Sequence, residues 1–159
     1  MFTPGNIIHA FFLSTNPPKP KYLISLFRSN DMCVLACFTT SKERAGVPLE
    51  NIKHGKNKTA EGEVVSYVFL KNKVVGINPD TDVSFGFPLQ TTVRFDYCIQ
   101  NKNEKAFFKL MKDPVVVGKL YKEEYENLIY SMYQSNDIQE GYKKCFEDIL
   151  FQLSNDEEA

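Results

Sequence analysis

The chain has 159 residues, of which 43% are hydrophobic and 13% are aromatic. That length supports one domain with a real core and is short for two domains of typical size. We therefore expect a single domain over residues 1–154, followed by a frayed acidic tail over 155–159. The 19 basic and 20 acidic residues give a net charge of −1, which excludes a global attraction to nucleic acid and leaves only local patches for such binding.

The four cysteines lie among apolar neighbours, form no CxxC pair, and share the chain with only two histidines. This pattern is typical of free core thiols in a reducing compartment, so we expect no metal and no cofactor. The apolar run from Ile7 to Leu13 is interrupted by His9 and is much shorter than a membrane span. The sequence therefore predicts a soluble cytoplasmic protein with no membrane partner.

In chain order, the first two thirds of the sequence predicts strands. A proline-rich segment, 14–20, follows the first strand, and the turn at Arg28–Asp31 joins the next two as a hairpin. The polar stretch 42–62, with several lysines and two glycines, predicts a long loop. The predicted strands are Asn6–Leu13, Lys21–Phe27, Met32–Phe38, Val64–Leu70 and Gln90–Gln100.

After Asn101 the hydrophobic spacing becomes helical. Apolar residues recur every three or four positions over 120–132 and again over 138–153, which predicts two amphipathic helices. Strands first and helices last indicate an α+β protein, mainly β. Its sheet is expected to be antiparallel and strongly curled, with the C-terminal helices packed at one side.

The stretch QTTVRFDYCIQ, Gln90–Gln100, alternates residue types with a period of two. In a strand, Arg94, Asp96 and Cys98 would share one face while Val93 and the other apolar residues face the core. An opposite-charge pair at i, i+2 is ordinary on a solvated face. A functional interpretation needs support from other parts of the chain.

Several short motifs, in this order along the chain, give that support. Pro4–Ile7 begins the first strand, Lys19-Pro20 begins the second, and Thr40-Ser41 follows the third; Arg94-Phe95-Asp96 and Val117–Leu120 come later. This series resembles the MazF/PemK family of endoribonuclease toxins over residues 4–129. The family usually has arginine where this chain has Lys19.

The resemblance implies an SH3-like, PemK/MazF-like curled barrel that forms a homodimer, cleaves single-stranded RNA without a metal by 2′-hydroxyl attack, and is inhibited by a small acidic antitoxin. It implies Asp96 as the base, Arg94 as the group that stabilises charge or protonates the leaving oxygen, and Thr40 as a hydrogen-bond donor to the scissile phosphate. The lysines of the 42–62 loop also suit an ordinary solvated loop. The predicted RNA-binding or phosphate-binding residues are Lys19, Lys21, Ser41, Lys53, Lys56 and Lys58.

Two other functions fit the same residues. Lysine lacks the planar fork with which arginine grips phosphate, so Lys19 favours a non-catalytic module that binds nucleic acid or protein. The second of these other functions is that of a CcdB-like poison, which binds gyrase through its terminal helix. Tyr22 is expected in the core or stacked on a base. We expect His9 to be structural, and His54 to lie on a loop too mobile for catalytic geometry.

Overall fold

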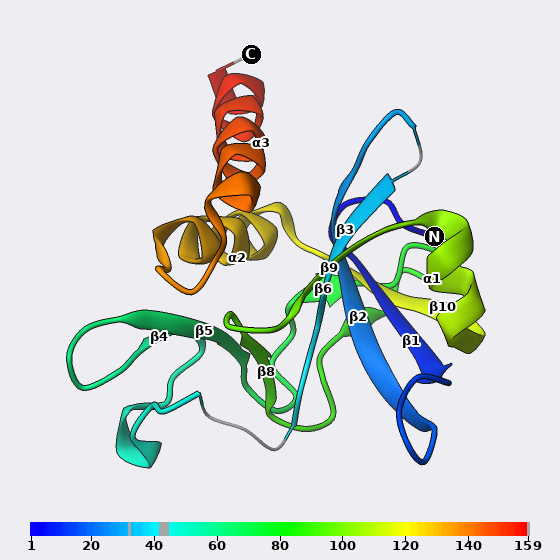
Figure 1. The fold of residues 1–159 in the computed structure, drawn as a ribbon, viewed down its shortest axis with the longest axis horizontal. Helices are drawn as coiled ribbons and strands as arrows, with labels where there is room; N and C mark the ends of the chain where they lie inside the picture. Colours follow the sequence, from blue (N-terminus) through cyan, green and yellow to red (C-terminus); the bar gives the residue numbers. More distant parts are fainter. Residues whose placement is uncertain (32, 42–44, 159) are drawn as a thin grey trace.

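The computed structural model describes residues 1–31, 33–41 and 45–158. Met32, the predicted start of a strand, and residues 42–44 of the predicted loop lie outside the described residues. Figure 1 shows the arrangement of the elements. In chain order these are β1 (Asn6–Phe12), β2 (Lys19–Arg28), β3 (Cys33–Phe38), the 3-10 helix η1 (Leu49–Asn51), β4 (Gly55–Lys58), β5 (Val64–Phe69), β6 (Gly76–Ile77), β7 (Ser84–Phe85), β8 (Thr91–Arg94), β9 (Ile99–Asn103), α1 (Glu104–Leu110), β10 (Met111–Leu120), α2 (Lys122–Gln134) and α3 (Glu140–Glu158).

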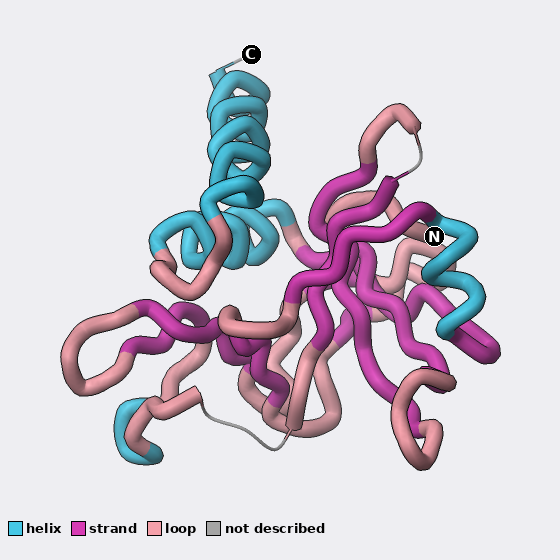
Figure 2. Tube along the Cα trace, in the orientation of Figure 1, coloured by secondary structure: helices cyan, strands magenta, loops and turns pink. Residues whose placement is uncertain are grey.

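The strands form two antiparallel sheets. The larger sheet has seven strands in the order β7-β6-β10-β1-β2-β3-β9, and the smaller has three in the order β4-β5-β8. In Figure 2, α2 lies next to the strands, and α3 follows α2 and extends away from the sheets. The predicted α+β class, with antiparallel sheets and C-terminal helices, is confirmed. No closed barrel is formed by the part of the chain that the structure describes.

The central strands of the larger sheet are buried on both faces, which explains their nearly continuous apolar sequences. Ile7 and Ile24 belong to the larger core, which also takes side chains from the smaller sheet, α2 and α3. Ile8 and Leu23, one position away on each strand, belong to a smaller core that Phe107 of α1 completes. Because successive side chains point to opposite faces of a strand, the same strand contributes side chains to both cores.

The two helices predicted near the C-terminus are present as α2 and α3. Leu128, Ile129 and Met132 of α2 and Phe146 of α3 are fully buried, as the helical spacing predicts. The far end of α3 points away from the sheets (Figure 1). This helix continues through residue 158, past the start of the predicted frayed tail at 155. The segment contains neither glycine nor proline, so no residue there breaks the helix.

The predicted single strand over Gln90–Gln100 is wrong. A turn separates β8 from β9, closed by the Cys98 N–H, which donates to the Arg94 carbonyl at 3.1 Å. The chain must turn here because β8 pairs with β5 in the smaller sheet whereas β9 pairs with β3 in the larger one. As a result Cys98 is buried while Asp96 is exposed, so these two residues do not share a face.

Several elements of the structure were not predicted. The described part of the 42–62 segment contains η1 and β4 and is therefore not a loop throughout. The helix α1 is capped by Asn103, whose Oδ1 accepts a hydrogen bond from the Ala106 N–H at 2.8 Å. The strand β10 pairs with β1, and its Gly118 lies where an added Cβ would be 2.9 Å from the Phe85 ring. Glycine at this position lets Phe85 pack onto the strand.

Candidate functional site

A cleft opens where β2 and β3 separate. Their pairing ends at Leu23 and Phe38, and the chain after β3 then leaves the larger sheet. Thr40 forms an antiparallel bridge with Thr92 of β8, and each N–H donates to the other carbonyl at 2.8 Å. The start of β2 therefore lies across a gap from residues 39–41, because one strand stays in its sheet while the other joins the second sheet.

The cleft has a volume of about 450 Å³ and carries positive charge. It brings together four of the predicted site residues, Lys19, Lys21, Thr40 and Ser41, from segments twenty residues apart in sequence. No acidic side chain is among its described lining residues. The remaining lining residues are His9, Pro20, Tyr22, Thr39, Pro88, Leu89 and Thr91.

Local hydrogen bonds hold the walls of the cleft. Thr15 Oγ1 accepts from the Lys19 N–H at 3.1 Å and donates to the Phe12 carbonyl at 2.9 Å, which fixes the start of β2 against the end of β1. Thr39 Oγ1 donates to the Tyr22 carbonyl at 3.3 Å across the gap. Burial raises the pKa of the Tyr22 phenol, so this side chain stays neutral at physiological pH.

Arg94 and Asp96 form an ion pair outside the cleft. Arg94 Nε lies 2.9 Å from Asp96 Oδ1, and Arg94 Nη2 lies 3.0 Å from Asp96 Oδ2, so the guanidinium and the carboxylate make a two-point contact. The guanidinium also lies over the Tyr97 ring, 4.9 Å from its centroid. Neither residue lines the cleft, although Arg94 lies only two positions after Thr92, the bridging partner of Thr40.

The lysines predicted to extend the RNA-binding surface lie at and beside β4. Lys56 Nζ donates to Gln134 Oε1 of α2 at 2.9 Å and lies 6.0 Å from the centre of the Tyr130 ring. Lys53 and Lys56 line a second hollow beside α2, and Lys58 is exposed at the end of β4. That hollow, unlike the cleft, also contains glutamates. The structure therefore does not place these lysines in the β2–β3 cleft.

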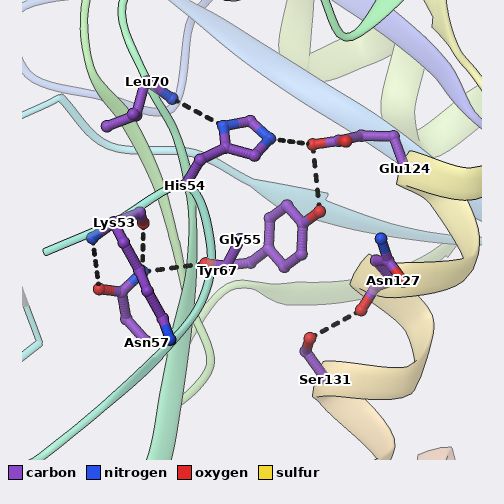
Figure 3. Close-up of polar contacts among 9 residues, drawn as sticks. All are labelled: Lys53, His54, Gly55, Asn57, Tyr67, Leu70, Glu124, Asn127 and Ser131. Atoms are coloured by element: carbon purple, nitrogen blue, oxygen red, sulfur yellow. Dashed lines mark hydrogen bonds and ion pairs between the residues drawn. The ribbon is translucent and has the colours of Figure 1, made fainter.

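His54 is held in a hydrogen-bonded cluster between β5 and α2 (Figure 3). Its Nδ1 accepts from the Leu70 N–H at 3.2 Å, and its Nε2 contacts Glu124 Oε1. The Tyr67 hydroxyl donates to the same glutamate oxygen at 3.1 Å. Burial, and secondarily the Glu124 carboxylate, raises the pKa of Tyr67 well above its usual value. We call these three side chains, His54, Glu124 and Tyr67, the Glu124 cluster.

Both ring nitrogens of His54 are occupied in this cluster. Because Nδ1 accepts a hydrogen bond from Leu70, the hydrogen-bond network assigns the proton to Nε2, which donates to Glu124. Neither nitrogen is left to take a proton from a substrate. The expectation of a mobile loop at His54 also differs from the structure, since its side chain is only 12% exposed.

His9 also lines the cleft, although the sequence predicted a structural role for it. It lies on β1, opposite Tyr22 of β2, and the two ring centroids are 4.9 Å apart at an interplanar angle of 58°. The signal in the sequence is a histidine within an apolar strand. That signal alone does not tell a structural side chain from one at the edge of a cleft.

Comparison of the chain with protein-family models, curated proteins and solved structures gives no match. The function must therefore be argued from the site. Within residues 1–31, 33–41 and 45–158, no three histidine, cysteine, aspartate or glutamate side chains gather as a metal site would require. No helix among these residues is both long and apolar enough to cross a membrane.

Proposed function

We propose that this protein is an endoribonuclease of the MazF/PemK type that takes single-stranded RNA into the β2–β3 cleft. The observation that carries the proposal is the meeting of Lys19, Lys21, Thr40 and Ser41 in a cleft whose described lining has no acidic side chain. Cations with hydroxyl groups are the usual partners of a phosphodiester. The proposal includes an SH3-like arrangement of the two sheets, which their packing around one shared core supports.

The residues have distinct roles in this proposal. Lys19 and Lys21 neutralise the phosphate and the charge that develops as the 2′-oxygen attacks phosphorus. Thr40 donates a hydrogen bond to the scissile phosphate. Cleavage leaves a 2′,3′-cyclic phosphate and a 5′-hydroxyl. The acidic antitoxin and the homodimer that the resemblance implies belong to the same proposal, with the antitoxin competing with RNA for the positive cleft.

A second candidate is a non-catalytic module that binds RNA in the same cleft. The observation that favours it is the pairing of Arg94 with Asp96, because these two of the three groups that the resemblance assigns to catalysis hold each other. Both oxygens of the Asp96 carboxylate accept hydrogen bonds from Arg94, so they are engaged within the pair. The module would hold RNA without cutting it.

One experiment separates these functions. The purified full chain is mixed with single-stranded RNA in excess chelator, and both cleavage and the affinity for a fully 2′-O-methylated, uncleavable RNA are measured at several salt concentrations. Replacing Lys19 and Lys21 with alanine should weaken binding and reduce the salt slope by up to about 1.4, at roughly 0.7 for each phosphate contact to a single strand. The matched control replaces Lys143 and Lys144 of α3, which removes the same charge away from the cleft.

Each outcome has one meaning. Cleavage by the parent supports the nuclease, and loss of cleavage in Asp96→Asn with binding retained would add Asp96 as the base. Binding without cleavage supports the module. A parent that binds no RNA, or lysine variants that bind as the parent does, would overturn the assignment of the cleft.

A further inference from the structure

The two histidines of this chain have opposite environments. His54 has both ring nitrogens hydrogen-bonded within the Glu124 cluster. His9 lines the cleft, and within the described residues no hydrogen bond reaches either of its ring nitrogens. Among those residues, Ser66 Oγ is the only fully buried side-chain nitrogen or oxygen atom that lacks a hydrogen-bond partner. The ring nitrogens of His9, which have no partner among the described residues, are therefore not fully buried and are open to solvent in the cleft.

The backbone around His9 is irregular. The pairing of β1 with β10 shifts register between Ile7 and Ile8 and again between His9 and Phe11. Bulges of this kind are common beside active sites, where they re-aim a side chain. The ring is also braced against Tyr22, whose own ring packs edge-on against Phe87 with centroids 5.0 Å apart. His9 is thus held in one place by packing, with its polar edge left free.

We propose that His9 is the proton-transfer residue of the cleft, the base that takes the proton from the ribose 2′-hydroxyl. This inference rests on the proposed function. As the 2′-oxygen–phosphorus bond forms, the 2′-hydroxyl proton moves to the free nitrogen of neutral imidazole. The phosphorus–5′-oxygen bond breaks, and the departing 5′-oxygen takes a proton from water. The products are the 2′,3′-cyclic phosphate and the 5′-hydroxyl, and the imidazolium then returns its proton to solvent.

The surroundings of His9 suit this role. Among the described residues, the other titratable side chains that line the cleft are Lys19, Lys21 and Tyr22, all on β2. On its other side, β10 places Val115 opposite His9 in the register. No described carboxylate lines the cleft to hold the imidazole in an ion pair, and the two ammonium groups are placed to bind the phosphate beside it. Asp96 is outside the cleft and paired with Arg94, so His9 is better placed than Asp96 to reach the substrate.

The test compares His9→Gln with His54→Gln, a matched change at the other histidine. We expect His9→Gln to lower kcat by about 100-fold or more with KM and the affinity for uncleavable RNA little changed, as loss of a general base does. Imidazole accepts a proton only when neutral, so the parent rate should fall at acid pH, and this limb of the pH profile should vanish in His9→Gln. His54→Gln, although less stable, should keep the limb.

A further variant guards against a merely structural effect. In His9→Ala the ring is missing from the cleft, so added imidazole should restore part of the cleavage rate, which a structural role would not allow. Parent-like cleavage by His9→Gln with an unchanged acid limb would overturn the assignment of His9 and leave the nuclease in place. A parent that binds RNA and does not cut it would overturn the role of His9 while sparing the binding cleft, and a parent that binds no RNA would overturn both.

Discussion

Replacing Glu124 with alanine tests whether the Glu124 cluster holds the smaller sheet against α2. Glu124 Oε1 is the shared acceptor for two donors, His54 Nε2–H and the Tyr67 hydroxyl. The side chain of Glu124 is 16% exposed, and Tyr67 is 1% exposed. Water therefore has little access to the groups that the substitution leaves without a partner.

The expected cost follows from these contacts. A buried donor left without an acceptor costs about 1–3 kcal/mol, so two donors predict a loss of roughly 2–6 kcal/mol in the free energy of unfolding. The gain in helix propensity from glutamate to alanine offsets only a few tenths of a kcal/mol. For a chain of this size, a loss of about 3 kcal/mol lowers Tm by roughly 6–12 °C. Tyr67→Phe removes one donor and leaves Glu124 bonded to His54, so it should cost only about 1 kcal/mol.

Urea denaturation followed by circular dichroism measures these free energies. Glu123→Ala is the matched control, since it makes the same change one residue earlier at an exposed position and should stay within about 0.5 kcal/mol of the parent. In the variant that combines Glu124→Ala with Tyr67→Phe, the second change should cost less free energy than it does alone, because the Tyr67 hydroxyl has already lost its acceptor. A Glu124→Ala protein within 0.5 kcal/mol of the parent, or strictly additive changes, would refute the cluster as a stabilising unit.

Two further predictions concern alkaline pH and assembly. Burial raises the pKa of Tyr67 and Tyr125 well above their usual range, so the stability they contribute is complete below the unfolded value near 10 and is lost as pH rises above it. Urea denaturation from pH 8 to 11 should show a decline of up to about 1.4 kcal/mol per pH unit for each tyrosine, and Tyr67→Phe should reduce that slope. We also expect a homodimer, because α3 leaves Phe151 63% exposed. Light scattering should give twice the chain mass, and a monomer at micromolar concentration would contradict it.

The local sequence was enough to predict those strands and helices whose own residues carry a periodic hydrophobic pattern. The apolar runs of β1, β2 and β5 and the helical spacing of α2 and α3 were all predictable, because each buries side chains at a fixed period. The helix α1 buries only Phe107, so its pattern is too short to recognise. The strand β10 contains Pro114, which breaks a strand pattern, and it becomes a strand by pairing with β1, about a hundred residues earlier.

The stretch Gln90–Gln100 shows the limit of a local pattern. The stretch is a strand over Thr91–Arg94, where β8 pairs with β5, but Thr91, Thr92 and Val93 are all buried there, so the two faces do not alternate between core and solvent. The turn that follows exists because β9 is needed beside β3, in the other sheet. No residue in the stretch specifies that change of sheet, so the predicted face shared by Asp96 and Cys98 was lost to long-range pairing.

The candidate site also depends partly on the local sequence and partly on the tertiary structure. The sequence alone determined that Lys19, Lys21, Thr40 and Ser41 are candidates, since their chemistry is visible in the residue types and motifs. Their meeting in one cleft was decided by the tertiary structure, through the bridge of Thr40 to Thr92 that parts β3 from β2. The histidines depended wholly on partners distant in sequence. His54 is satisfied by Leu70 and Glu124, 16 and 70 residues away, whereas the strand pairing that stacks His9 on Tyr22 leaves its nitrogens open to the cleft. The availability of a ring nitrogen depends on which groups the fold brings to it, and a single sequence does not record those distances.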